Sequence, residues 1–90
     1  MSPNDTVKTI AMDLITARLP SDHLAQLHVA FEVDDASEAV YRIEAVLAPA
    51  APAPAASTVV GLSRALTHAL CRNGVAGFPF LTFVRTPAAA

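Results

Sequence analysis

The stretch Leu27-His28-Val29-Ala30-Phe31-Glu32-Val33-Asp34 decides the fold of this 90-residue chain. Its large apolar side chains alternate strictly with smaller or polar ones, and this is the period of a strand with one buried face. Its β-branched and aromatic content favours a strand over a helix. We therefore predict a β-strand over residues 27–34, in a chain whose other segments are mostly helical in pattern.

Residues 38–48, which follow, have two interpretations. As a helix, the segment would begin after an Asp34-Asp35 turn, with Ser37 as its N-cap and a buried face of Val40, Ile43 and Leu47. As a strand, it would form a hairpin with residues 27–34 and turn four residues inward: Tyr41, Ile43, Ala45 and Leu47. The Ala and Glu content favours the helix, and the strand stays open as the alternative.

A helix is predicted before this region, over residues 5–19. Its apolar residues recur at helical spacing: Val7, Ile10, Ala11, Leu14 and Ile15. Asp5 is the expected N-cap, and Pro20 ends the helix because it lacks a backbone donor. A short turn is expected at Ser21-Asp22-His23.

A second helix and a final strand are predicted in the remainder of the chain. The helix covers residues 58–72, with Ser57 or Thr58 as its cap and Gly74 at the left-handed C-terminal position. Its apolar stripe consists of Val59, Leu62, Leu66, Ala69 and Leu70. Residues 78–85 form a strand, which Pro79 places at a sheet edge or near the strand's start.

The fold class predicted from these elements is α+β, in the order α-β-α-linker-α-β, within a single domain over residues 1–90. Residues 1–48 form an acidic unit, since all eight acids lie there beside three bases. Residues 49–56 are a Pro/Ala linker, expected as a loop or an extended spacer. Residues 57–87 form a basic unit with three arginines and no acid, and residues 88–90 a frayed tail. We expect the oppositely charged units to dock on each other, within one chain or between two.

Composition excludes several classes of protein. The formal net charge is −2, which excludes a uniformly basic nucleic-acid binder. No run of about 18 apolar residues is present, so no membrane span is expected. No charged segment followed by an apolar one opens the chain, so no signal peptide is expected. The one cysteine, Cys71, cannot form an internal disulfide, which favours a reducing compartment, the cytoplasm.

No catalytic constellation can be assembled from the spacing of the reactive residues. The three histidines share no metal-ligand spacing with each other or with Cys71. Three glycines are too few for a phosphate-binding loop. A non-catalytic role without a cofactor is therefore favoured over an enzyme.

Two features predict a surface for a protein partner or for a second copy of the chain. Arg64, His68 and Arg72 recur every four residues, giving a basic stripe about 12 Å long on the second helix. The final strand carries three phenylalanines, with Phe78 and Phe80 on one face and Phe83 on the other. A strand with aromatic residues on both faces needs two covers, which predicts a homo-oligomer.

Residues 28–47 resemble the first strand and helix of a vicinal oxygen chelate module, the superfamily of glyoxalases and bleomycin-resistance proteins. The residues that carry the resemblance are His28–Asp35 and Glu38–Ala45. In that family the histidine that opens the strand is often a metal ligand, so the resemblance implies a divalent-metal ligand at His28. The resemblance ends at Leu47. No Asp or Glu follows Glu44, so the acidic ligand on the family's last strand has no counterpart.

Three functional hypotheses follow. The first is a small cytoplasmic accessory or protein-interaction domain without catalysis, acting as a homodimer. The second is a ligand- or metal-binding relic of the vicinal oxygen chelate superfamily, centred on His28. The third is a phage- or plasmid-borne inhibitor protein, which the small size alone suggests.

Overall fold

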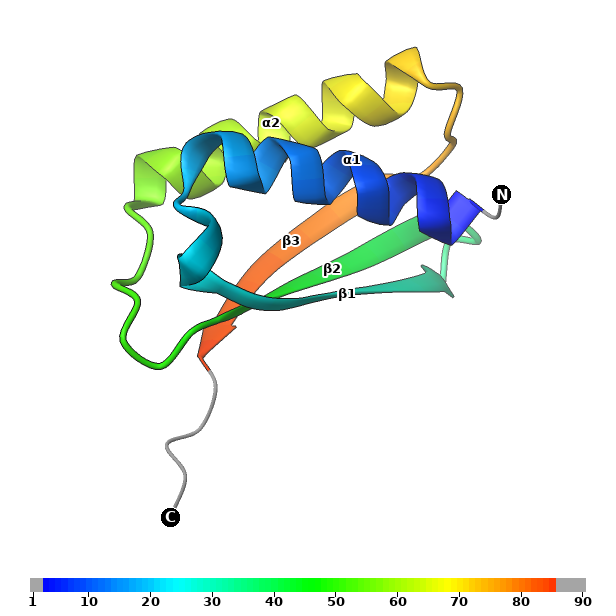
Figure 1. Ribbon diagram of the computed structural model, residues 1–90. Helices are drawn as coiled ribbons and strands as arrows, with labels where there is room; N and C mark the ends of the chain where they lie inside the picture. Colours follow the sequence, from blue (N-terminus) through cyan, green and yellow to red (C-terminus); the bar gives the residue numbers. More distant parts are fainter. Residues whose placement is uncertain (1–2, 86–90) are drawn as a thin grey trace.

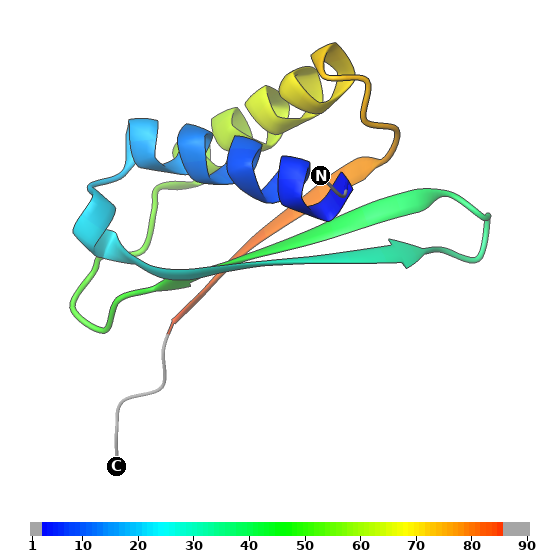
Figure 2. The ribbon, with the colours of Figure 1, turned by 45° about the vertical axis from the view of Figure 1, so that its right-hand side comes forward.

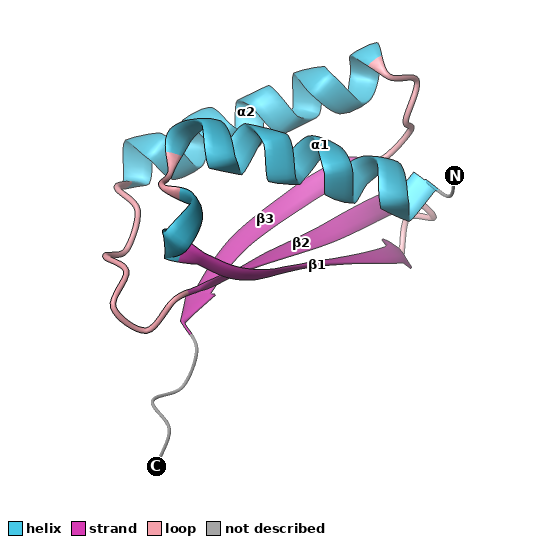
Figure 3. Ribbon diagram, in the orientation of Figure 1, coloured by secondary structure: helices cyan, strands magenta, loops and turns pink. Residues whose placement is uncertain are grey.

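The computed structural model describes residues 3–85, and their fold is α+β, as predicted. Two helices lie side by side on one face of a three-stranded sheet (Figures 1 and 3). The elements follow in the order α1 (Pro3–Arg18), a 3-10 turn η1 (Ser21–His23), β1 (Leu24–Val33), β2 (Ala39–Leu47), α2 (Ala56–Arg72) and β3 (Phe78–Arg85). The frayed tail predicted at residues 88–90 lies outside the described residues.

The helix predicted over residues 38–48 is wrong, and the alternative strand is correct. Residues 39–47 form β2, the central strand, which pairs antiparallel with β1 and parallel with β3. Helical spacing would have left Tyr41 and Ala45 outside the buried face. The strand buries them together with Ile43 and Leu47, each at most 3% exposed. Side-chain burial therefore outweighed the weak helical preference of Ala and Glu.

The turn between β1 and β2 replaces the predicted helix N-cap at Ser37. The Asp34 carboxylate accepts hydrogen bonds from the backbone N–H groups of Ala36 at 3.0 Å and Glu38 at 2.8 Å. The Ser37 N–H donates to the Asp34 carbonyl at 2.9 Å, and Ser37 itself has a φ of 62°. This is a three-residue hairpin loop with a left-handed residue at the position that usually holds glycine.

We expect Ser37→Gly to stabilise the protein by about 0.5 kcal/mol. Glycine removes the Cβ penalty of the left-handed conformation, and its greater freedom in the unfolded chain offsets part of the gain. Urea unfolding would measure the change, with Ser37→Ala as a control that keeps the Cβ and brings no gain. A Ser37→Gly variant less stable than the parent would contradict this account of the turn.

The helices predicted over residues 5–19 and 58–72 are confirmed, but their predicted N-caps are wrong. α1 begins at Pro3, which places Asp5 inside its first turn, and it ends before Pro20 as expected. α2 begins at Ala56 after the N-cap Ala55, whose side chain makes no capping bond. The Ala55 carbonyl accepts the N–H groups of residues 58 and 59, so Ser57 and Thr58 lie within the first turn instead of preceding it.

The C-terminal end of α2 confirms the role predicted for Gly74. Gly74 has a φ of +69°, and its N–H donates to the Cys71 carbonyl at 3.1 Å. The Val75 N–H reaches back to the Leu70 carbonyl at 2.9 Å. This pair of bonds is a Schellman motif, which turns the chain from α2 towards β3.

The Pro/Ala linker is a loop with an internal turn instead of an extended spacer. The Ala51 N–H donates to the Ala48 carbonyl at 3.0 Å, and the Ala51 side chain is buried. Arg85 at the end of β3 donates from Nη1 to the carbonyls of Pro49 at 3.1 Å and Ala51 at 2.7 Å. The Arg85 side chain thereby links the end of β3 to this loop.

The acidic and basic segments share one core. Ten buried residues from both segments form it: Val7, Ala11, Ile15, Leu27, Tyr41, Ile43, Ala45, Leu62, Leu66 and Leu70. The apolar stripe predicted on the second helix supplies three of them. Apolar packing and the β2–β3 ladder therefore join the segments, whereas the Arg42–Glu32 ion pair lies within the acidic segment. Neither helix of residues 3–85 has the length and apolar character that a membrane span requires.

Candidate functional site: the open face of the sheet

The face of the sheet that points away from α1 and α2 is not covered by any helix or strand of the described chain (Figure 2). We call it the open face. The strand registers place twelve residues on it in four rows across β3, β2 and β1: Phe78, Val40 and Glu32; Phe80, Arg42 and Ala30; Thr82, Glu44 and His28; Val84, Val46 and Gln26.

The two phenylalanines predicted to share a face lie together on the open face. Phe78 is 58% exposed and Phe80 is 48% exposed, whereas Phe83 on the opposite face packs against the core. Val40, Val46 and Val84 are half-buried members of the open face. On the opposite side of β3, α2 covers the face that carries Phe83. Within residues 3–85, one of the two covers predicted for this strand is therefore present.

Charged side chains occupy the centre of the open face. Arg42 donates from Nε to Glu32 Oε2 at 2.8 Å, and its guanidinium carbon lies 5.7 Å from the centre of the Phe80 ring. Both members of the ion pair are more than half exposed, so the pair contributes little to stability, but it orients the guanidinium. Glu44 is exposed beside Arg42 on the same strand and has no ion-pair partner within residues 3–85.

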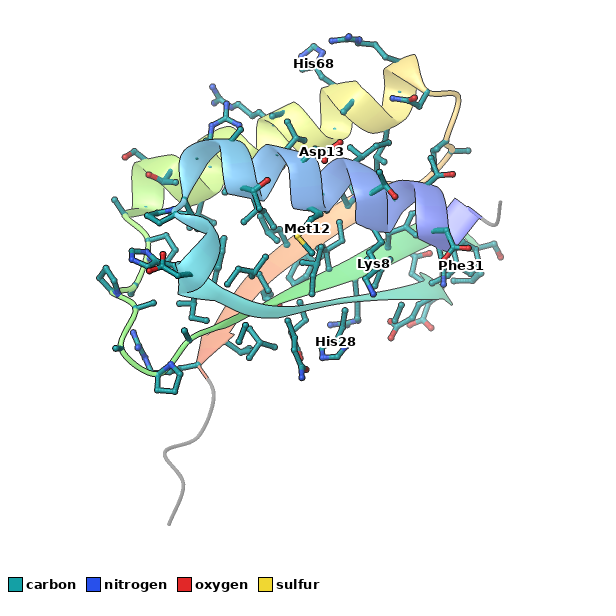
Figure 4. The ribbon with its side chains drawn as sticks, viewed as in Figure 1. Lys8, Met12, Asp13, His28, Phe31 and His68 are labelled. Atoms are coloured by element: carbon teal, nitrogen blue, oxygen red, sulfur yellow. The ribbon has the colours of Figure 1, made fainter. Side chains whose placement is uncertain are left out.

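His28, the predicted metal ligand, also lies on the open face (Figure 4). Its Nε2 lies 2.9 Å from Gln26 Oε1, and it sits opposite Glu44 in the β1–β2 register. No cluster of three or more potential metal ligands occurs within the part of the chain that the structure describes. The segment that the family resemblance would make a helix is β2. Metal binding at His28 stays a prediction.

The predicted basic stripe lies on the other side of the molecule. Arg64, His68 and Arg72 are exposed on the outer surface of α2, and Figure 4 shows His68 pointing away from the sheet. The six residues predicted to bind a partner therefore fall in three places. Phe78 and Phe80 lie on the open face. Phe83 lies between the sheet and the helices, and the basic stripe lies on the outer surface of α2.

The hairpin end of the sheet has an apolar hollow of its own. A shallow groove of about 470 Å³ lies between this end and the C-terminal end of α2, and Phe31, Tyr41 and Val75 contribute to its lining. Phe31 remains 48% exposed because the hairpin extends past the start of α1 (Figure 2). No charged residue of the described chain lines the groove.

The four open-face residues of β2 were not predicted from the sequence: Val40, Arg42, Glu44 and Val46. The helical interpretation of residues 38–48 placed them on different faces of a helix. The signal that could have found them is the alternation of β2, in which apolar inward residues are separated by these four outward ones.

No protein-family model, curated protein or solved structure matches this chain. The geometry of the open face therefore supplies the argument for function.

Proposed function

We propose that this protein is a small, non-catalytic interaction domain that acts as a cytoplasmic homodimer and docks through the open face of its sheet. The observation that carries the proposal is the exposure of Phe78 and Phe80, at 58% and 48%, on a face without a covering element in residues 3–85. Exposed aromatic side chains grouped on one face are typical of protein interfaces.

The sheet topology supports the same conclusion. β2 and β3 form a parallel pair within a mixed sheet, and parallel pairing is commonest in sheets that are covered on both faces. Here α1 and α2 cover one face, and a second molecule would supply the other cover. On folding, a chain of this size buries a smaller share of its surface than a large domain does. Association with a second copy would add to the limited stability that its own core provides.

Among the described residues, the open face carries no buried acid, base or nucleophile, and this favours binding over catalysis. The polar residues there are solvent-exposed, and no Asp, Glu, Lys, Arg or His side chain is buried in the described chain. Cys71 is an exposed free thiol on α2, which fits a reducing compartment such as the cytoplasm.

We expect Phe80→Ser to weaken self-association about 100-fold. Two copies of the ring leave the interface of a symmetric dimer, and each buried aromatic contributes on the order of 1.5 kcal/mol. Sedimentation equilibrium over a concentration series would measure the dissociation constant. Val60→Ser is the matched control, since Val60 is 51% exposed but lies on α2, away from the open face.

The two variants separate an interface effect from a general effect of surface polarity. The proposal predicts that Val60→Ser keeps the parent dissociation constant. Equal weakening by both variants, or an unchanged constant for Phe80→Ser, would show that the open face is not the docking surface.

A further inference from the structure

The outward residues of β2 form a pattern that is its own complement. Val40, Arg42, Glu44 and Val46 stand in this order along the open face. When the order is reversed, Val40 and Val46 exchange places, and so do Arg42 and Glu44. A second copy of β2 running antiparallel across the first would therefore meet it with matched residues.

We propose that a second copy of this chain covers the open face with its β2 antiparallel to the first, so that Arg42 of each copy pairs with Glu44 of the other. The inference rests on the proposed function and deepens it, because it assigns the partner and its orientation. The two-fold axis lies between the sheets, perpendicular to β2, and passes midway between Arg42 and Glu44. Such an interface uses the same surface on both copies.

The same rotation matches the flanking strands by size. The four rows of the open face reverse their order, so each β3 faces the other β3 and each β1 faces the other β1. Phe80 then lies opposite the smaller Thr82 of the second copy, and His28 opposite the smaller Ala30. Phe78 lies opposite Val84, which extends the apolar contact at both ends of β3. Large residues facing small ones allow two sheets to interdigitate.

The alternative two-fold axis, parallel to β2, is disfavoured by charge. It would place Arg42 against Arg42 and Glu44 against Glu44 at the centre of the interface. Like charges brought together in a partly desolvated contact are strongly unfavourable.

Arg42 is already oriented for a second partner. Glu32 accepts from its Nε, and the Phe80 ring lies 5.7 Å from the guanidinium carbon, so the side chain is held over the open face. A guanidinium has five N–H donors, and those not bound to Glu32 remain for another carboxylate. Glu44, which has no ion-pair partner in residues 3–85, supplies that carboxylate from the second copy.

Cross-linking between single cysteines tests the orientation. All variants carry Cys71→Ser to remove the exposed native thiol. The Val40→Cys and Val46→Cys chains, one bearing a size tag, are mixed and treated with a bis-maleimide that spans about 10 Å, the usual spacing of stacked sheets. The proposal predicts a cross-link between the two different chains. It predicts none between two Val40→Cys chains, whose thiols would lie about 20 Å apart along the strands.

Val60→Cys, on the outer side of the helix layer, reports random collisions and should give only background cross-linking. Efficient cross-linking of Val40→Cys with itself would overturn the antiparallel orientation while leaving the dimer of the proposed function intact. A chain that is dimeric by sedimentation but gives no cross-link from either position would overturn the open face as the interface. A monomeric parent chain would instead overturn the proposed function.

Discussion

Gly77→Ala should destabilise the protein by about 2–4 kcal/mol, combining backbone strain with overpacking of the core. Gly77 has a φ of +143°, a backbone conformation that residues other than glycine rarely adopt. An added Cβ would lie 2.6 Å from Cε2 and 2.8 Å from Cδ2 of Tyr41. The Tyr41 side chain is 3% exposed and packs against Phe31 with ring centres 5.2 Å apart, so moving it away from the added Cβ would disturb this contact.

Urea unfolding would measure this loss, and the chain provides a matched control. Gly61 lies in the middle of α2, where an added Cβ meets no atom within 4 Å. Gly61→Ala should stabilise the protein by up to about 1 kcal/mol, because alanine is a better helix former. The account of the α2–β3 connection would be contradicted by a Gly77→Ala chain that unfolds at the parent's urea concentration.

Leu66→Ala should cost about 2–5 kcal/mol, the usual range for a leucine removed from a packed core. Leu66 is 0% exposed and lies at the middle of the buried face of α2, between Leu62 and Leu70. Such a loss is a large share of the stability of a small domain. The core consists of ten buried residues, two of which are the small Ala11 and Ala45, so each leucine is a substantial part of it.

The control for Leu66→Ala is Val60→Ala on the same helix. Val60 is 51% exposed, so its truncation should change the free energy of unfolding by less than about 0.5 kcal/mol. Thermal or urea unfolding at one fixed protein concentration compares the two, because association would make stability depend on concentration. Equal small effects would mean that α2 does not pack on the sheet as described.

The elements whose hydrophobic period indicated one structure, or whose composition decided between two, were predictable from the sequence. α1, α2 and β3 were identified correctly, and β1 was identified from the alternation of Leu27, Val29, Phe31 and Val33. Residues 38–48 satisfied two periods at once, and local composition could not decide between them. The segment is a strand because only a strand buries both Tyr41 and Ala45 beneath the helices. The packing of the helices over these two residues is a feature of the tertiary structure, and the pattern of a single sequence does not reveal it.

The end points of the elements and the candidate site were predicted less well, for related reasons. Ser57 and Thr58 are good caps by residue type, but the path of the Pro/Ala loop starts α2 at Ala56. Phe78 and Phe80 were assigned to one face correctly because a strand has a fixed period. The charged pair Arg42 and Glu44 was missed because its position depends on β2 being a strand. Whether the basic stripe on α2 binds a partner stays a prediction.

The molar mass of the unmodified chain in solution tests the central claim most directly. Light scattering across a series from about one to one hundred micromolar would follow the mass as the chain associates. We predict a mass that rises from 9.4 kDa towards twice that value and then stays constant, as expected for a closed two-fold dimer. A mass that remains at 9.4 kDa over the whole series would contradict the proposal that a second copy covers the open face.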